Sequence, residues 1–218
     1  MSARLPVTGP ATLLVIAKEP VPGRVKTRLI PPYTPQEAAA LAEAALADTL
    51  HTVLKVPARR RVLVLDGAPG PWLPPGFDIV PQEAGGLDER IAAAFGHCDH
   101  GPALLIGMDT PQLTTDLLGD IGREGHDAWF GPAADGGFWA LGFADPARAA
   151  ALVRGVPMST DRTGSTQRCR LVEAGLCVSD LPELRDVDTA DAAVAVAACC
   201  PPGSRFAATV NSLAEVGR

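Results

Sequence analysis

The sequence predicts an α/β protein, a three-layer α/β/α sandwich built around a mixed, mostly parallel sheet. Short apolar runs rich in β-branched residues, of which Thr12–Ala17 (TLLVIA) and Ala103–Ile106 (ALLI) are the clearest, are typical of strands buried on both faces. Segments with helical periodicity separate these runs. Strands that alternate with helices indicate βαβ units in a sheet that is covered on both sides.

The sequence indicates where the first helix begins. Thr34-Pro35-Gln36-Glu37 places a Thr at the N-cap, a Pro at the first helical position and a Glu that completes a capping box. Apolar residues then recur at helical spacing from Ala38 to Val53. The remaining strands are expected at 62–65, 77–80, 127–130 and 138–143, and the remaining helices at 87–95, 146–154, 163–174 and 189–198.

Composition bounds the class of protein. The chain has 218 residues, of which 47% are hydrophobic, and this is enough to bury a sizeable core. We expect one domain over residues 1–218, with a core at about 12–198 and a loosely attached tail after Pro201. The net charge of −6 argues against wholesale binding to DNA or RNA, which usually needs a basic face.

Cysteine usage and hydropathy indicate the compartment. The five cysteines form no C-x-x-C pair, which fits a reducing cytosol. The longest apolar helical stretch, Ala192–Cys200, is too short to span a bilayer, and no signal-peptide pattern opens the chain. We therefore expect a soluble cytoplasmic protein without a membrane partner. A homodimer stays open, because the Ala-rich helix at 189–198 could pack on the sheet or on a second subunit.

The loop after the first strand is the strongest candidate for binding phosphate. Residues 18–29 (KEPVPGRVKTRL) carry four basic side chains and one acid, and in open α/β sheets this loop lies at the ligand crevice. Backbone N–H groups near Gly23 could approach phosphate oxygens, and Lys26 and Arg28 could neutralise a leaving pyrophosphate or nucleoside diphosphate. The loop has neither Walker A nor G-x-G-x-x-G spacing. The alternative is a solvated basic loop.

Three acidic motifs are candidates for a metal site. Asp109 lies in the segment 107–111, which directly follows the buried strand 103–106; a carboxylate there faces the crevice and suits a hard cation such as Mg²⁺. A turn-capping Asp is the alternative. Of Asp186 and Asp188, we expect only one to serve the site while the other caps the next helix or bonds the loop. Asp135, in a Gly-rich loop, could bind metal or orient an acceptor hydroxyl, or could mark an ordinary hairpin turn.

Taken in order, the motifs resemble a known family. The segments that carry the resemblance are AKEPVPGRVKTRL at 17–29, GGLDER at 85–90, GMDTP at 107–111, GPAADGGF at 131–138 and DVDT at 186–189. They are similar to bacterial proteins with the GT-A, or nucleotide-diphospho-sugar transferase, fold, some of which are called arsenosugar-type glycosyltransferases. More distantly, they resemble phospholactate guanylyltransferases and cytidylyltransferases of isoprenoid synthesis.

The resemblance implies a transferase that uses an activated nucleotide and a small-molecule acceptor. It implies that Lys26 and Arg28 hold the diphosphate or triphosphate, and that Asp109 and Asp188 hold Mg²⁺ or Mn²⁺. It places Gly85, Gly86 and Arg90 near the nucleobase and ribose, with Gln82 able to read the base edge. The candidate nucleotide-binding residues are Lys18, Gly23, Arg24, Lys26, Arg28, Gln82, Gly85, Gly86 and Arg90, and the candidate catalytic residues are Lys26, Arg28, Asp109 and Asp135.

The chain departs from related families at two positions. A Pro-containing loop at 19–23 replaces the LAGG-x-S-x-R-M-G loop of molybdenum-cofactor nucleotidyltransferases, so fewer backbone donors are available for a triphosphate. Gly107-Met108-Asp109 replaces the D-x-D of many glycosyltransferases. We favour nucleotidyl transfer from a nucleoside triphosphate to a small phosphorylated or anionic acceptor. Glycosyl transfer with Asp135 as the base, and nucleotide binding without turnover, are the alternatives.

Overall fold

One seven-stranded sheet forms the centre of the computed structural model, which describes residues 10–119, 121–122 and 125–216. Its order is β3-β2-β1-β4-β6-β5-β7. Strand β6 is antiparallel to its neighbours β4 and β5, and the other neighbouring pairs are parallel, so the prediction of a mixed, mostly parallel sheet is confirmed. The strands are β1 (Thr12–Lys18), β2 (Arg60–Asp66), β3 (Asp78–Pro81), β4 (Ala103–Gly107), β5 (Ala128–Pro132), β6 (Phe138–Phe143) and β7 (Val178–Asp180).

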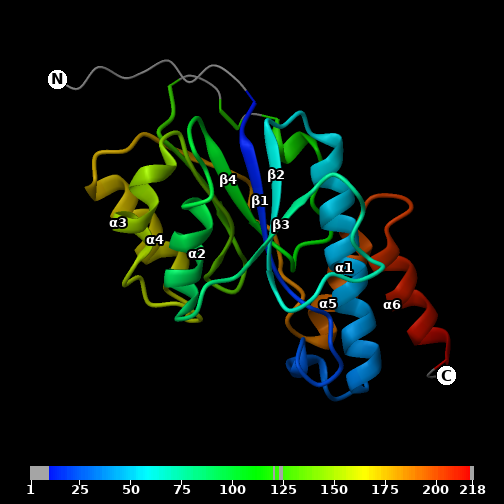
Figure 1. Ribbon diagram of the computed structural model, residues 1–218. Helices are drawn as coiled ribbons and strands as arrows, with labels where there is room; N and C mark the ends of the chain where they lie inside the picture. The colour runs from blue at the N-terminus through cyan, green and yellow to red at the C-terminus, as the bar shows by residue number, and fades with distance from the viewer. Residues whose placement is uncertain (1–9, 120, 123–124, 217–218) are drawn as a thin grey trace.

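Helices cover both faces of the sheet, as Figure 1 shows. On one side lie α1 (Pro35–Lys55), α5 (Ala190–Cys199) and α6 (Arg205–Val216), and on the other α2 (Leu87–Phe95), α3 (Ala149–Val153) and α4 (Thr163–Glu173). The predicted three-layer arrangement is therefore confirmed. None of the helices in the described residues is both long enough and apolar enough to cross a membrane. The described residues also form three short 3₁₀ helices: η1 (Thr27–Leu29), η2 (Asp116–Leu118) and η3 (Pro146–Arg148).

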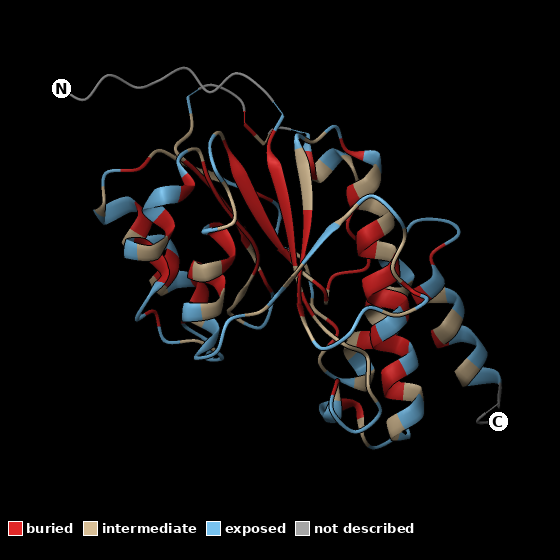
Figure 2. Cartoon of the chain, in the orientation of Figure 1, coloured by how far each residue is buried: buried red, intermediate tan, exposed pale blue. Residues whose placement is uncertain are grey.

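The apolar strands create a separate core on each face of the sheet. Leu13 and Val15 of β1 pack in the cluster that includes Leu46 of α1, whereas Leu14 packs in the cluster that includes Ile91 of α2. Successive side chains of a strand point to opposite faces, so a strand between two helical layers must be apolar throughout. Figure 2 shows the central strands buried along most of their length. The strand ends, where polar residues begin, are thereby held in fixed positions.

Local signals predicted the start of α1 correctly. The backbone N–H of Thr34 donates to Glu37 at 2.7 Å, and the backbone N–H of Glu37 donates back to the Thr34 hydroxyl at 3.3 Å, which completes the capping box. The helix expected at 146–154 is divided into η3 and α3. Strand β7, a short and partly polar segment, was not predicted.

The expectation of a loosely attached tail after Pro201 is wrong. Residues 205–216 form α6, and its Phe206 is completely buried in a cluster with α1 and α5. Asp48 of α1 caps this helix, since its carboxylate accepts hydrogen bonds from the Ser204 hydroxyl at 2.7 Å, the Arg205 N–H at 3.0 Å and the Phe206 N–H at 2.9 Å. A carboxylate is favoured there because the first N–H groups of a helix have no partner within the helix.

We expect Phe206→Ala to destabilise the protein by about 3–4 kcal/mol, because it removes a fully buried ring and leaves a cavity between α1 and α6. A loss of this size lowers the melting temperature by roughly 6–15 °C in a protein of this length. The measurement is thermal unfolding followed by circular dichroism. Asn211→Ala, on the exposed side of α6, is the control. Equal melting of the two variants would mean that α6 does not stabilise the fold.

Candidate functional site

Two hollows meet at the carboxyl ends of the parallel strands β1 and β4. The larger, here called the cleft, has a volume of about 350 Å³. The smaller, here called the basic hollow, has a volume of about 280 Å³. Parallel strands end at the same edge of a sheet, so the loop after β1 and the residues after β4 come together there. The two hollows share four lining residues: Lys18, Met108, Asp109 and Asp188.

The basic hollow brings together all four cationic side chains predicted from the first loop. Arg24, Lys26 and Arg28 line it together with Lys18. Glu19 anchors this loop by accepting a hydrogen bond from the Ala68 N–H, after β2, at 2.9 Å. Gly23 does not line the hollow, and its φ of 76° shows why a glycine is favoured in this turn.

Lys26 is the centre of the charged network. Its ammonium lies 2.8 Å from Asp109 Oδ1 and 3.1 Å from Asp188 Oδ1, and its side chain is only 7% exposed. Burial acts to lower the pKa of Lys26, but the two carboxylates outweigh it and raise that pKa above its ordinary value. The backbone of Lys26 is left-handed, with φ 49° and ψ 38°, which a residue with a side chain rarely adopts. Lys26 therefore bridges the two acids that the sequence assigned to a metal.

Asp188 receives a second cation. Arg28 donates from Nη1 to Asp188 Oδ2 at 3.2 Å, although the arginine side chain is 74% exposed. Burial acts to raise the pKa of Asp188, but Lys26 and then Arg28 outweigh it and lower that pKa below its usual value. Asp188 is thus ionised over a wide range of pH and faces both hollows.

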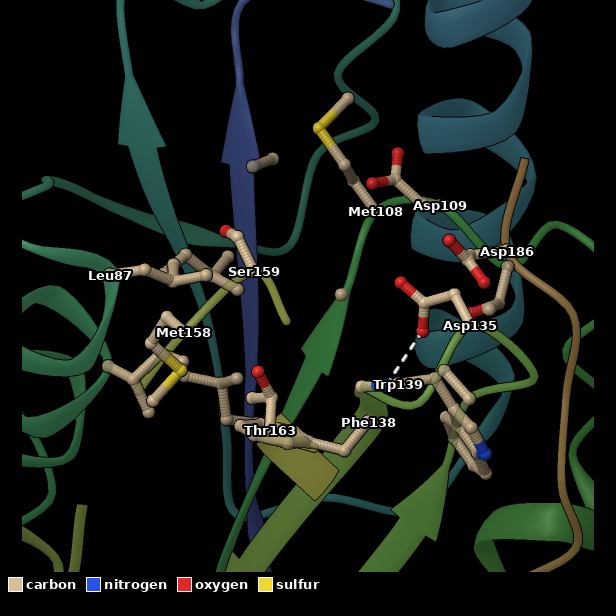
Figure 3. Close-up of a pocket in the computed structure, with 18 of the residues that line it drawn as sticks. Leu87, Met108, Asp109, Asp135, Phe138, Trp139, Met158, Ser159, Thr163 and Asp186 are labelled. Carbon is tan, nitrogen blue, oxygen red and sulfur yellow. Dashed lines mark hydrogen bonds between the residues drawn. The ribbon is translucent and has the colours of Figure 1, made fainter. Parts of the chain in front are cut away.

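Three carboxylates converge at the acidic end of the cleft. Oxygen atoms of Asp135, Asp186 and Asp188 all lie within 4.8 Å of one another. Figure 3 shows Asp135 and Asp186 reaching this point from different loops, with Asp109 beside them. The expectation that only one acid of the Asp186–Asp188 pair serves the site is wrong. Residues two apart in an extended segment share a side, and it is Val187, 1% exposed, that points into the core. This spacing could have identified Asp186.

The neighbouring carboxylates and burial disfavour the ionised form of Asp186. Burial, followed by repulsion from Asp135 and Asp188, raises the pKa of Asp186 to about 6. A carboxyl group held in this way is under electrostatic stress at neutral pH, which a bound cation would relieve. Such groups are typical of sites arranged for a ligand rather than for stability.

The tip that carries Asp135 is held rigidly. The N–H of Gly137 donates to Asp135 Oδ1 at 2.7 Å, and the N–H of Gly164 in α4 donates to the carbonyl of Gly136 at 2.7 Å. Gly136 has φ 90°, and a side chain there would collide with the backbone of Asp161. The loop is therefore the turn between β5 and β6, and it also fixes a carboxylate at the cleft.

The donor set fits a divalent cation of the Mg²⁺ or Mn²⁺ type. Hard cations prefer carboxylate oxygens, and Asp135, Asp186 and Asp188 supply three of them from a compact group. Asp109 lies outside this group and shares the Lys26 ammonium with Asp188. The role of Asp109 as a metal ligand stays a prediction.

The opposite wall of the cleft is mostly apolar. Figure 3 shows Leu87, Met158 and Phe138 facing the acidic end across the cleft, with the Ser159 hydroxyl among them. Ser159 has φ 59°, so it and Lys26 are the two residues other than glycine with positive φ in the described part of the chain. Strained backbone tends to collect at ligand sites. This wall suits the organic part of a ligand.

The GGLDER motif has a structural explanation of its own. The N–H of Gly86 donates to Glu89 at 2.8 Å, which caps α2, and a side chain at Gly85, whose φ is 115°, would collide with the Glu89 carboxylate. Neither glycine lines the cleft, whereas Gln82 and Arg90 do. The amide nitrogen of Gln82 donates to the carbonyls of Ala17 at 2.7 Å and Val64 at 3.3 Å. The nucleotide-binding roles of these residues stay predictions.

Comparison with known proteins places the chain in a family. Residues 40–160, more than half of the chain, match the family of uncharacterized proteins conserved in bacteria (DUF2064), and the chain belongs to this family. No curated protein matches it. The family match spans GGLDER, Asp109 and Asp135, but not the basic loop or Asp188.

Solved structures confirm the fold that the resemblance implied. A provisionally assigned nucleotide-diphospho-sugar transferase from Desulfovibrio desulfuricans G20 is 25% identical, with a TM-score of 0.81 over 94% of both chains. A homologue of Rv0371c from Mycobacterium sp. strain JC1 (20%, TM-score 0.56) covers 93% of this chain and 98% of its own. A cytidylyltransferase from Leptospira borgpetersenii (12%, TM-score 0.55) covers 95% and 94%. The last two, under 25% identical, show the fold alone.

We expect Asp186→Asn to stabilise the protein above pH 6. A carboxyl group whose folded-state pKa is raised weakens the fold as pH rises from its unfolded pKa, near 4, through about 6, so removing its charge helps most at neutral pH. The gain at pH 7.5 is about 1–2 kcal/mol after discounting for solvent screening, and it shrinks at pH 4.5. Thermal unfolding at both pH values is the measurement.

Asp180→Asn is the matched control for that experiment. Asp180 forms an exposed ion pair with Arg168 at 2.6 Å, so losing its charge removes an attraction and should leave stability unchanged or slightly lower at pH 7.5. A lower melting temperature for Asp186→Asn at pH 7.5 would contradict the repulsion that we assign to the three carboxylates.

Proposed function

We propose that this DUF2064 protein is a metal-dependent transferase that moves a nucleotidyl group from a nucleoside triphosphate to a small phosphorylated or anionic acceptor. One observation carries the proposal. A hollow lined by four basic side chains and a cleft with a three-carboxylate group share the side chains of Asp109 and Asp188. A metal-bound phosphate chain is complementary to this arrangement. Its anionic oxygens match the basic hollow, and its metal ion matches the three carboxylates.

The basic hollow is the proposed position of the leaving phosphates. Arg24, Lys26 and Arg28 present cationic groups to one space, and charge-assisted hydrogen bonds from such groups are the strong ones. Negative charge grows on the leaving pyrophosphate as its bond breaks, so fixed cations there favour the transition state over the ground state. Lys18 lies where the hollow meets the cleft, next to the α-phosphate in this arrangement.

The proposed metal ligands are Asp135, Asp186 and Asp188. A divalent cation held there would neutralise phosphate oxygens and orient the attacking group. Lys26 and Asp109 flank this group, and we propose that they position Asp188 and the phosphate chain. This assignment extends the metal pair predicted from the sequence, Asp109 and Asp188, by Asp135 and Asp186.

The bond changes need no covalent enzyme intermediate. An acceptor oxyanion attacks the α-phosphorus, the new oxygen–phosphorus bond forms, and the bond to the β-phosphate bridging oxygen breaks, with its electron pair leaving on pyrophosphate. An anionic oxygen carries no proton, so this reaction requires no general base. The chain contributes position and charge, which are the main sources of rate enhancement in phosphoryl chemistry.

The apolar wall of the cleft is the proposed place for the nucleoside. Leu87 and Ile16 offer apolar contact, and Gln82 is close by at the ends of β1 and β2. Since the polar atoms of Gln82 are engaged with backbone and Arg90, we propose that it shapes the pocket rather than reading the base edge directly. We propose that Gly85 and Gly86 act indirectly, because they form the turn and the N-cap at which α2 begins.

Glycosyl transfer is the second candidate. The similarity to the D. desulfuricans protein, described as a nucleotide-diphospho-sugar transferase, favours it. In that reaction an acceptor hydroxyl attacks the anomeric carbon and a nucleoside diphosphate leaves into the same basic hollow. Asp135, exposed at the cleft, would accept the proton of the hydroxyl if the sugar is inverted.

The activity is tested by incubating the protein with Mg²⁺, each nucleoside triphosphate and a panel of phosphorylated acceptors, and by measuring pyrophosphate. Lys26→Met should lower kcat/KM by about 100-fold or more, because it removes the cation that lies between Asp109 and Asp188 in the proposed phosphate site. Arg24→Met, at the rim of the same hollow, should cost less. Sugar nucleotides are assayed in parallel for release of nucleoside diphosphate.

Sugar-nucleotide turnover without pyrophosphate release would replace nucleotidyl with glycosyl transfer. Nucleotide binding without either product would leave a non-catalytic nucleotide-binding protein. An unchanged kcat/KM for Lys26→Met would contradict the proposed role of the basic hollow in binding the leaving phosphates.

The metal assignment predicts an order among acid variants. In Mn²⁺ titrations followed by electron paramagnetic resonance, Asp186→Asn and Asp188→Asn should weaken binding about tenfold or more, because each removes a charged ligand. Asp109→Asn should weaken it less, since Asp109 lies outside the group formed by Asp135, Asp186 and Asp188. If Asp109→Asn has the largest effect, the ion lies between Asp109 and Asp188 and displaces Lys26.

A further inference from the structure

Arg90 lines the cleft without a counter-ion. No carboxylate among the described residues forms an ion pair with it within 4 Å, in contrast to Lys26 and Arg28 in the neighbouring hollow. Its Nε atom is buried and has no hydrogen-bond partner. Among the described residues, the one hydrogen bond of its side chain runs from Nη1 to Gln82 Oε1 at 3.3 Å. A partly buried cation left in this state is costly unless a ligand completes it.

The acids nearest to Arg90 in the sequence are engaged elsewhere. Asp88 accepts a hydrogen bond from the Gly155 N–H at 2.7 Å, and Glu89 accepts one from the Gly86 N–H at 2.8 Å. At the far end of the cleft, Asp109 and Asp188 pair with Lys26 and Arg28, and neither Asp135 nor Asp186 forms an ion pair with Arg90 within 4 Å. The described residues therefore offer Arg90 no anionic partner.

Gln82 fixes the orientation of the guanidinium. Its amide nitrogen is tied to carbonyls of two strands, at Ala17 and Val64, and its amide oxygen holds Nη1 of Arg90. Neither Nε nor Nη2, which form one edge of the guanidinium, has a hydrogen-bond partner among the described residues. Two parallel N–H groups along such an edge match the two oxygens of a phosphate or carboxylate.

We propose that Arg90, positioned by Gln82, binds a small oxyanion in the cleft, the phosphate or carboxylate group of the acceptor. This site is separate from the basic hollow, which takes the leaving phosphates. The identification of the anion as the acceptor's rests on the proposed function. The family resemblance places Arg90 near the nucleobase and ribose instead, but a neutral base would leave the guanidinium charge unmatched.

Calorimetric titrations of the whole protein test this with four probes: methyl phosphate, glycolate, pyrophosphate and guanosine. Arg90→Gln should weaken binding of the oxyanion probe about 10- to 100-fold, as expected for loss of a charged bidentate contact, and should change pyrophosphate binding less than threefold. Arg28→Gln, in the basic hollow, is the matched control. It should weaken pyrophosphate binding and change binding of the oxyanion probe less than threefold. Arg90→Lys keeps the charge without the planar edge and should give an intermediate loss.

Methyl phosphate binding that depends on Arg90 assigns a phosphate site, and glycolate binding that depends on Arg90 assigns a carboxylate site. The proposal is overturned if neither probe binds the unaltered protein, if their binding depends on Arg28 but not Arg90, or if only guanosine binding responds to Arg90. Arg90→Lys serves as the test if Arg90→Gln does not fold, as judged by its melting curve. Absence of pyrophosphate release with every nucleoside triphosphate would sink the proposed function but leave an Arg90-dependent oxyanion site measurable.

Discussion

The buried ammonium of Lys26 connects three segments that are distant in the sequence: the loop after β1, the turn after β4 and the segment before α5. Withdrawing an ammonium from water is costly, and two carboxylates within hydrogen-bonding distance compensate for it. The left-handed backbone at Lys26 adds roughly 1–2 kcal/mol of strain, which the ion pairs help to hold in place. The basic hollow and the acidic end of the cleft are arranged around this one side chain.

The ion pairs of Lys26 leave two other charged groups of the cleft, Asp186 and Arg90, without a partner of opposite charge among the described residues. Asp186 lies beside two other carboxylates, and its pKa of about 6 records the repulsion. Arg90, in the same cleft, has no counter-ion within the described residues. A fold selected for stability alone would pair such groups or replace them by apolar ones. Unmatched acid and unmatched base in one cleft are instead complementary to a ligand that carries both a cation and separate oxyanions.

The sequence predicted what local patterns determine. Apolar runs identified the buried strands, and Thr34 and Glu37 identified the start of α1, because both signals lie within a few residues. The docking of α6 could not be predicted this way, since its cap is Asp48, more than 150 residues earlier. The bridge from Lys26 to Asp109 and Asp188 is equally non-local. Asp186 was missed for a different reason, because the spacing of an extended Asp-Val-Asp already places both acids on one side.

Motif resemblance pointed to the candidate site but did not distinguish the reactions, because both nucleotidyl and glycosyl transfer place a diphosphate against basic residues. The two reactions differ in the second group that the protein must hold beside the diphosphate. Glycosyl transfer sends the whole nucleoside diphosphate away as one leaving group, and its acceptor is a hydroxyl that needs a base. Nucleotidyl transfer divides the phosphate chain and uses an acceptor that is itself anionic. Two cationic positions in separate hollows, Lys26 with Arg28 in one and Arg90 in the other, match the second requirement, since each can hold its own oxyanion across the shared carboxylates.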